Sequence, residues 1–139
     1  MAVKFFNDEI SFKLKGKREI ANWLKNIAKE ENKTIDDLYY VFVSDNRLLE
    51  MNIKYLNHDC YTDIITFDYS SGNTISGEMY VSIETVKENA KEYNVDFRNE
   101  LLRVMLHGAL HLCGYKDETE DEKKKMRAIE NKYLEAISY

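Results

Sequence analysis

The sequence predicts a small α+β domain in which a mixed β-sheet packs against about five helices. Short segments rich in β-branched and aromatic residues alternate with longer segments whose apolar residues recur at helical spacing. The chain has 139 residues, which suits one hydrophobic core, so we expect a single domain over residues 1–139. With 44% hydrophobic and 32% charged residues, the composition is that of a globular protein and excludes a disordered chain.

The first half of the chain is expected to alternate between extended and helical segments. Residues 3–15 alternate loosely between apolar and polar, which predicts two short strands or one bent strand. A helix is predicted over 17–32, where apolar residues recur every three or four positions, and a strand over 38–43 (LYYVFV). Ser44 is a candidate N-cap for a helix that continues through Tyr55.

The second half contains the remaining strands and the longest apolar helix. We expect, in order, a strand over 61–67, a loop over 70–76, a strand over 78–82 that pairs back, and a helix over 83–93. Asp96 is the expected cap of a central helix over 97–113 that stops at Gly114. Thr119 and Glu122 form a capping-box pattern for a last helix to about residue 138.

Composition limits the environment and the partners. No apolar run is long enough to span a bilayer, the N-terminus has no signal-peptide pattern, and two cysteines make no disulfide framework. We therefore expect a cytoplasmic protein that has no membrane partner. The net charge is −5, but residues 13–33 carry seven basic and three acidic side chains. That segment is either a solvated helix face or a contact for RNA phosphates.

The three histidines limit where metal chemistry can occur. His107 and His111 are four residues apart on the predicted central helix, so both imidazoles leave the same face. Gly114 can reverse the chain at the helix end, and the carboxylate of Asp117 could then return beneath the two rings. The spacing predicts one metal ion held by His107, His111 and Asp117. The alternative is a hydrogen-bonded histidine pair on a core helix.

The same spacing occurs in the metzincin pattern H-E-x-x-H-x-x-G-x-x-H. Gly108 stands where those proteases carry the glutamate that serves as general base. Peptide hydrolysis by that mechanism would lack its proton acceptor, which disfavours a protease.

Three motifs in this chain resemble those of the YbeY family of bacterial rRNA-maturation endoribonucleases. The run HGALHLCGYKD (107–117) resembles the family signature H-G-x-L-H-L-x-G-Y-D-H. TDIITFDY (62–69) is similar to the family's T-D-V-L-S-F-P stretch, and GEMYVS (77–82) is similar to its G-D-I-x-I-S strand. The motifs keep their order and separations, so the resemblance covers about residues 45–120.

The resemblance implies a metal-dependent endoribonuclease that cuts single strands. The family combines a small α+β fold with one bound zinc ion, and it acts in 16S rRNA 3′-end maturation and ribosome quality control. The implied partner is therefore rRNA of the small ribosomal subunit. The third family histidine falls on Asp117, whose carboxylate is also a zinc ligand but makes Mn²⁺ or Fe²⁺ possible as well.

The chain departs from the family pattern near its expected catalytic residues. The family arginine that is tied to RNA cleavage falls on Leu56, and the family proline falls on Tyr61. His58 is the nearest substitute for the arginine, or else an exposed residue at a helix end. Asp63 could act on water or support a metal ligand, or serve only a turn. We take His58 and Asp63 as the candidate catalytic residues.

Two other functions remain open from the sequence alone. The departures at Leu56 and Asp117 would suit a non-catalytic ribosome-assembly or RNA-binding factor that a metal ion stabilises. Two histidines and a carboxylate also form the facial triad of non-haem iron oxygenases. The chain lacks the many strands of a jelly-roll oxygenase, which disfavours that function.

Overall fold

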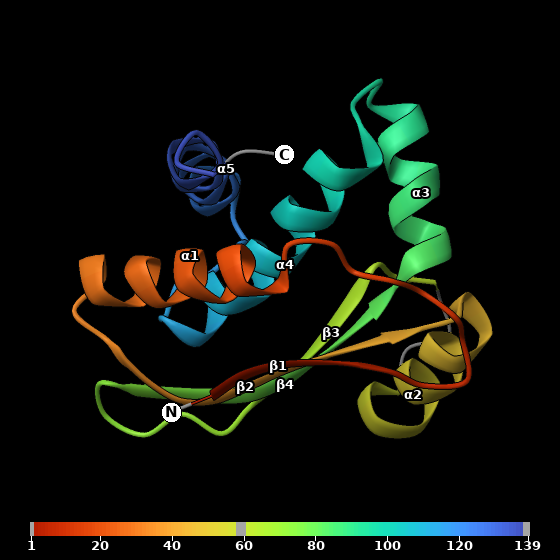
Figure 1. The fold of residues 1–139 in the computed structure, drawn as a ribbon, viewed down its shortest axis with the longest axis horizontal. Coiled ribbons are helices and arrows are strands. Elements are labelled where there is room, and N and C mark those ends of the chain that lie inside the picture. Colours follow the sequence, from red (N-terminus) through yellow and green to blue (C-terminus); the bar gives the residue numbers. More distant parts are fainter. Residues whose placement is uncertain (1, 58–60, 138–139) are drawn as a thin grey trace.

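A four-stranded mixed sheet in the order β1-β2-β4-β3 forms one layer of the molecule (Figure 1). The structure is a computed structural model that describes residues 2–57 and 61–137. Strand β2 pairs in parallel with both β1 and β4, whereas β3 runs antiparallel to β4. The strands are β1 (Ala2–Asn7), β2 (Thr34–Val43), β3 (Ile64–Asp68) and β4 (Thr74–Ser82). The expected mixed sheet in an α+β fold is confirmed.

The five helices of the described residues cover the two faces of the sheet unequally (Figure 1). One face carries four of them, whereas α2 covers only one end of the other face. The helices are α1 (Lys17–Glu30), α2 (Asp45–Leu56), α3 (Ile83–Glu92), α4 (Phe97–Leu112) and α5 (Glu120–Leu134). None of the helices described here is long and apolar enough to cross a membrane.

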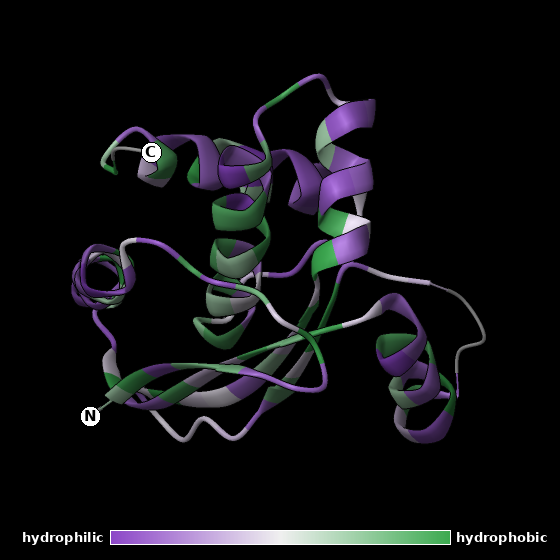
Figure 2. Ribbon diagram, turned by 45° about the vertical axis from the view of Figure 1, so that its right-hand side comes forward, coloured by the Kyte–Doolittle hydropathy of each residue, from purple (hydrophilic) through white to green (hydrophobic). Residues whose placement is uncertain are grey.

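Helix α4 is the centre of the main hydrophobic core (Figure 2). Apolar residues lie nearly all round it, so it is covered by the sheet, by α3 and by α5 instead of facing water on one side. Its buried apolar residues are Leu101, Leu102, Val104, Met105, Leu106, Ala109, Leu110 and Leu112. The Tyr40 hydroxyl of β2 donates a hydrogen bond to the Met105 carbonyl at 2.7 Å, which satisfies the buried polar group of that ring.

The backbone of α4 comes closest to the sheet at Gly108. A Cβ at this position would lie 2.8 Å from Cδ1 of Ile64 and 3.0 Å from Cγ of Met79, closer than carbon atoms pack. The glycine therefore lets the helix lie against β3 and β4. The same contact leaves no room for a glutamate, so a zincin-type base is excluded here by packing.

Several element boundaries differ from those predicted. Strand β2 begins at Thr34 and β4 at Thr74, because these ends pair with each other although Asp36 and Asp37 are poor strand formers. Part of the expected loop over 70–76 is therefore strand. The expected strand over 61–67 begins only at Ile64, since residue 63 contributes a single backbone bond, from Ser82 N–H to its carbonyl.

The N-terminal prediction is wrong beyond Asn7. The Asn7 side chain donates to the Phe12 carbonyl at 2.7 Å, and residues 8–16 form no further strand. Helix α1 stops short of residue 32, where Asn32 has a left-handed backbone (φ 58°). Helix α5 ends at Leu134, and the predicted limit near residue 138 lies outside the described residues.

Two of the three predicted helix caps form as expected. The Ser44 hydroxyl accepts a hydrogen bond from Arg47 N–H at 3.1 Å, and Thr119 and Glu122 form the complete capping box of α5. Asp96 occupies the N-cap position of α4, but its side chain makes no cap hydrogen bond, which corrects the expected role of that carboxylate.

The Gly108 contact predicts that alanine at this position destabilises the protein, which is the opposite of its usual effect in a helix. Alanine normally stabilises a helix interior by about 1 kcal/mol over glycine. Here the added methyl group would overpack the helix–sheet contact, which typically costs about 1–3 kcal/mol. The overpacking outweighs the gain in helix propensity, so we expect Gly108→Ala to lower the free energy of unfolding by up to about 2 kcal/mol in urea denaturation. A higher urea midpoint in the variant would contradict the contact.

Candidate metal centre

The end of α4 determines where the candidate ligands lie. Gly114 has φ 106°, a conformation that L-amino acids avoid, and it closes the helix with two backbone bonds. Gly114 N–H donates to the His111 carbonyl and Tyr115 N–H donates to the Leu110 carbonyl, at 3.0 and 3.1 Å, which is a Schellman motif. The Tyr115 hydroxyl anchors the reversed chain on Glu31 at 2.6 Å. The chain then returns beneath α4 and carries Asp117 with it.

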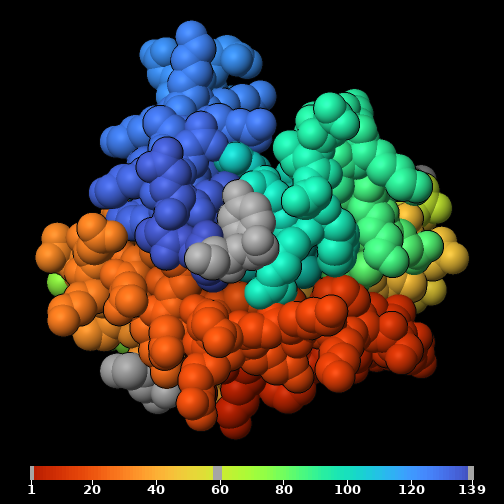
Figure 3. Space-filling model, turned by 45° about the horizontal axis from the view of Figure 1, so that its top comes forward, coloured from red at the N-terminus to blue at the C-terminus, as the bar shows by residue number. Residues whose placement is uncertain are grey.

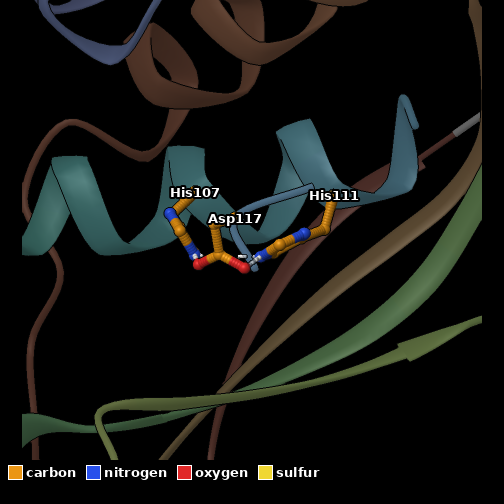
Figure 4. Close-up of side chains that lie close together, drawn as sticks. All are labelled: His107, His111 and Asp117. Atoms are coloured by element: carbon orange, nitrogen blue, oxygen red, sulfur yellow. Dashed lines mark hydrogen bonds and ion pairs between the residues drawn. The ribbon is translucent and has the colours of Figure 1, made fainter. Parts of the chain in front are cut away.

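The three predicted ligands come together beneath α4 (Figure 4). One donor atom from each residue lies within 4.8 Å of the others. Nε2 of His107 is 2.9 Å from Nε2 of His111 and 3.1 Å from Oδ2 of Asp117. Nε2 of His111 is 3.6 Å from Oδ1 of Asp117. Ligand atoms around a tetrahedral Zn²⁺ ion lie about 3.3 Å apart, so these separations suit one ion.

The hydrogen bonds of the two rings show why a cation belongs here. Nδ1 of His107 faces the Glu130 carboxylate at 2.7 Å, and Nδ1 of His111 faces the Tyr115 carbonyl at 2.9 Å. Both partners are acceptors, so each Nδ1 carries the proton and each neutral ring presents the lone pair of Nε2. Two lone pairs and a carboxylate then face one point. With the rings in this orientation, the arrangement fits a divalent metal ion.

Glu130 is a site residue that the sequence prediction missed. Its buried carboxylate joins His107 to Arg103, whose Nη1 lies 2.9 Å from Oε1 of Glu130. Arg103 also donates to the side chain of Asn131 at 2.7 Å. The signal was available in the sequence, since Glu130 shares the apolar face of the otherwise charged helix α5 with Met126, Tyr133 and Leu134. A carboxylate that holds the second nitrogen of a metal-binding histidine fixes the orientation of that ring.

The charges around His107 and the burial of its ring shift its pKa in opposite directions. Burial disfavours the imidazolium form, but the hydrogen bond and charge of Glu130 outweigh it, with support from Asp117 and Asp63, so the pKa of His107 is raised. The electrostatic potential at this ring is thus negative. A metal ion would benefit from the same negative potential.

Comparison with known proteins identifies the family. The model of the family "Endoribonuclease YbeY" matches residues 3–138. The chain is 47% identical to Endoribonuclease YbeY of Flavobacterium psychrophilum over 129 residues, which cover 93% of this chain and 92% of the relative. It is 45% identical to Endoribonuclease YbeY of Bacteroides fragilis over 134 residues, 96% of each chain. The chain belongs to the YbeY family.

A solved structure supports the same relationship at the level of the fold. The solution structure of TM1509 from Thermotoga maritima superposes with a TM-score of 0.69 at 30% identity, over 96% of this chain and 87% of that one. The resemblance drawn from the three motifs is confirmed, and with it the expectation of an enzyme, since the relatives are named as endoribonucleases, which hydrolyse RNA. The metzincin and oxygenase alternatives find no support in these comparisons.

The YbeY chain forms a cavity of about 440 Å³ beside the candidate metal site. Leu56 and Asp63 line this cavity together with His107, His111 and Asp117, so two positions singled out by the motifs reach the site. Burial raises the pKa of Asp63, although the charge of His107 opposes the shift. The Asn89 side-chain amide donates to Oδ2 of Asp63 at 3.4 Å. His58, the other candidate catalytic residue, lies outside the described residues.

The contact between Glu130 and His107 predicts that a change at Glu130 lowers the affinity for the metal, although Glu130 is not itself one of the proposed ligands. Glu130→Gln keeps the shape of the side chain but removes the negative charge between His107 and Arg103. We expect Zn²⁺ affinity, measured against a competing fluorescent chelator, to fall by about 10–100-fold.

The matched control for this prediction is Glu100→Gln. Glu100 is a second buried carboxylate beside the same histidine-bearing helix face, and it lines a neighbouring cavity of about 160 Å³ with His107 and Glu130. The control is expected to bind Zn²⁺ within about threefold of the wild type, because outer ligand support comes from direct hydrogen bonds. Equal losses in the two variants would show that Glu130 contributes only general electrostatics.

Proposed function

We propose that this YbeY chain is a metal-dependent endoribonuclease that cuts single-stranded rRNA of the small ribosomal subunit, in 16S rRNA 3′-end maturation and ribosome quality control. The observation that carries the proposal is the cluster of three acceptors from His107, His111 and Asp117 beside an open cavity. A structural zinc site is closed by four protein ligands, whereas a catalytic site keeps a position open. Three ligands next to a cavity favour catalysis. As an RNA-processing enzyme without a membrane-spanning helix among its described residues, the chain is proposed to act in the cytoplasm.

The proposed ion is a single Zn²⁺ held by the two Nε2 atoms and the Asp117 carboxylate. When bound, the ion would supply Lewis acidity toward a phosphoryl oxygen and lower the pKa of a coordinated water. Glu130 and the Tyr115 carbonyl keep both rings oriented with Nε2 toward the ion. The carboxylate in the third position makes the ligand set harder than three histidines, so Mn²⁺ and Fe²⁺ are the metals to compare with Zn²⁺.

Asp63 is the proposed general base. Its carboxylate lines the same cavity as the three ligands, and its raised pKa brings it nearer to neutral pH, where a base transfers protons efficiently. The Asn89 amide donates to one carboxylate oxygen of Asp63, and this contact helps to hold the group at the cavity. His58, in place of the family arginine, stays the second proposed catalytic residue.

The role of Asp63 predicts a loss of rate without a loss of metal. Asp63→Asn removes the proton acceptor and keeps the size of the side chain. We expect kcat for single-stranded RNA to fall by about 10²–10⁴-fold, with the metal content unchanged. Asp68→Asn is the control, because Asp68 lines the same cavity but its carboxylate accepts from Ser70 N–H. Wild-type kcat in Asp63→Asn would eliminate Asp63 as the base.

Metal dependence tests the proposed function itself. The purified protein is expected to carry about one metal ion per chain, and a chelator or His111→Ala should remove both the ion and RNA cleavage, with activity reduced by about 100-fold or more. Metal content is measured by mass spectrometry and cleavage on a labelled single-stranded RNA. In cells, depletion of the protein should leave 16S rRNA with unprocessed 3′ ends, and wild type but not His111→Ala should restore them.

The non-catalytic alternative predicts a different combination of results. A ribosome-assembly factor that uses the ion only for folding would bind metal, lose stability without it and cleave no RNA in vitro. Mature 16S rRNA 3′ ends after depletion, together with absent cleavage by the metal-loaded protein, would establish that alternative.

A further inference from the structure

The described residues that line the cavity beside the candidate metal site include no lysine or arginine side chain for RNA phosphates. Among these residues, the charged groups are the carboxylates of Asp63, Asp68 and Asp117. Leu56 occupies the position where the family pattern has an arginine. Proteins that hold single-stranded nucleic acid do so mainly with cations along the phosphate backbone. The neighbouring cavity has Arg103 and Arg127, of which Arg103 is paired with Glu130, so most of the attraction for RNA is expected from another surface.

A basic groove lies at the opposite edge of the sheet, between α1 and β1. This groove, of about 510 Å³, is lined by the cations Lys4, Lys17, Arg18 and Lys25, with Val3, Phe5, Phe6, Ala21 and Asn22 between them. No carboxylate belongs to this lining. Within the described part of the chain, none of the four cations forms an ion pair. Figure 3 shows α1 and the segment before it exposed along one flank of the molecule.

The amphipathic pattern of α1 creates this groove. Its buried face packs Ile20, Trp23, Leu24 and Ile27 onto the core, which turns Lys17, Ala21 and Lys25 outward, one turn apart. The small side chain of Ala21 leaves space between the two lysines. Lys17 and Lys25 are two helical turns apart, about 12 Å along the axis, so α1 places positive charges along a line that a phosphodiester chain can follow.

An exposed aromatic ring lies at the rim of the groove, on the side of β1 that faces away from α1. Phe6 is 47% exposed, and its ring meets Tyr39 edge-on at 5.7 Å between centroids, which holds the ring in place. A basic track beside an exposed aromatic ring is the usual arrangement for single-stranded nucleic acid, since bases stack on the ring while phosphates contact the cations. An acidic peptide would use the charges but has no group that requires the ring.

We propose that the groove formed by Lys4, Lys17, Arg18, Lys25 and Phe6 binds the RNA backbone outside the cleavage site. The proposal rests on the proposed function, because it assigns the groove to the same RNA strand that enters the metal cavity. Strand β1 and strand β3 are three strand spacings apart, about 14 Å, so one RNA must extend over several nucleotides to contact both. The groove thus provides affinity, and the metal cavity provides cleavage.

The test compares two variants with equal changes of charge. Lys17→Gln/Lys25→Gln alters the groove, and Lys91→Gln/Lys124→Gln alters exposed lysines of α3 and α5 outside it. Binding of a 2′-O-methyl RNA of roughly 20 nucleotides to the metal-loaded protein is followed by fluorescence anisotropy at several salt concentrations. We expect the groove variant to bind about tenfold more weakly and to lose about 1.4 from the slope of log K against log salt. The control variant should match the wild type.

Cleavage kinetics separate the groove from the active site. For a cleavable RNA of roughly 20 nucleotides, the groove variant should show a KM raised about tenfold with unchanged kcat. A dinucleotide, whose single phosphodiester is too short to span about 14 Å, should be cleaved equally by all three proteins. Unchanged binding in the groove variant, or the same loss in the control, would overturn the proposal. Preferential binding of a poly-glutamate peptide over RNA, lost in the groove variant, would overturn it in favour of an acidic protein partner.

The outcomes also distinguish the groove from the proposed function. RNA that binds through Lys17 and Lys25 but is not cleaved by the metal-loaded protein supports the groove and contradicts the nuclease. If RNA is cleaved in a metal-dependent way but its affinity is unchanged when both lysines are replaced, the result supports the nuclease and contradicts the groove.

Discussion

The contact between the backbone of α4 and the sheet at Gly108 is the constraint on which the rest of the structure depends. It brings the helix against Ile64 and Met79, and the core closes over the remaining faces of α4. A helix in this position must satisfy every polar side chain it carries within the protein or at a cavity. His107 and His111 lie one residue before and three residues after Gly108. The packing that excludes a side chain at residue 108 therefore also places the two imidazole rings at the cavity beside β3.

The ligand cluster is a local concentration of negative potential. Glu130 orients His107, the Tyr115 carbonyl orients His111, and Asp117 faces both Nε2 atoms. Each of these contacts directs an electron pair toward the same point. Without a cation there, the Nε2 atoms and the Asp117 carboxylate would repel one another. A bound cation would offset this repulsion, so metal binding at this site would also stabilise the fold. Replacement of a family histidine by Asp117 adds to that negative charge.

Local patterns in the sequence were enough to predict most of the site. The i, i+4 spacing of His107 and His111, with the left-handed Gly114, correctly brought Asp117 beneath the helix. Glu130 could not be located in the same way, since its contact depends on how α5 packs back on α4, which involves residues far apart in the chain. The early starts of β2 and β4 escaped prediction for the same reason, because the pairing of residues 34 and 35 with 74 and 75 continues both strands past an irregularity at Asp36 and Asp37.

The distribution of charge separates two tasks that a nuclease must perform. The carboxylates of Asp63, Asp68 and Asp117 that line the cavity would attract a metal ion but repel the phosphates of a substrate. A positive groove directly beside them would weaken the ion's hold by the same potential. The cations lie instead at the other edge of the sheet. Because that distance exceeds the screening length of about 8 Å at physiological salt, the negative potential of the cavity and the positive potential of the groove do not cancel each other. On this basis, the salt dependence of RNA binding reports on the α1–β1 groove, whereas the metal dependence of cleavage reports on α4 and its turn.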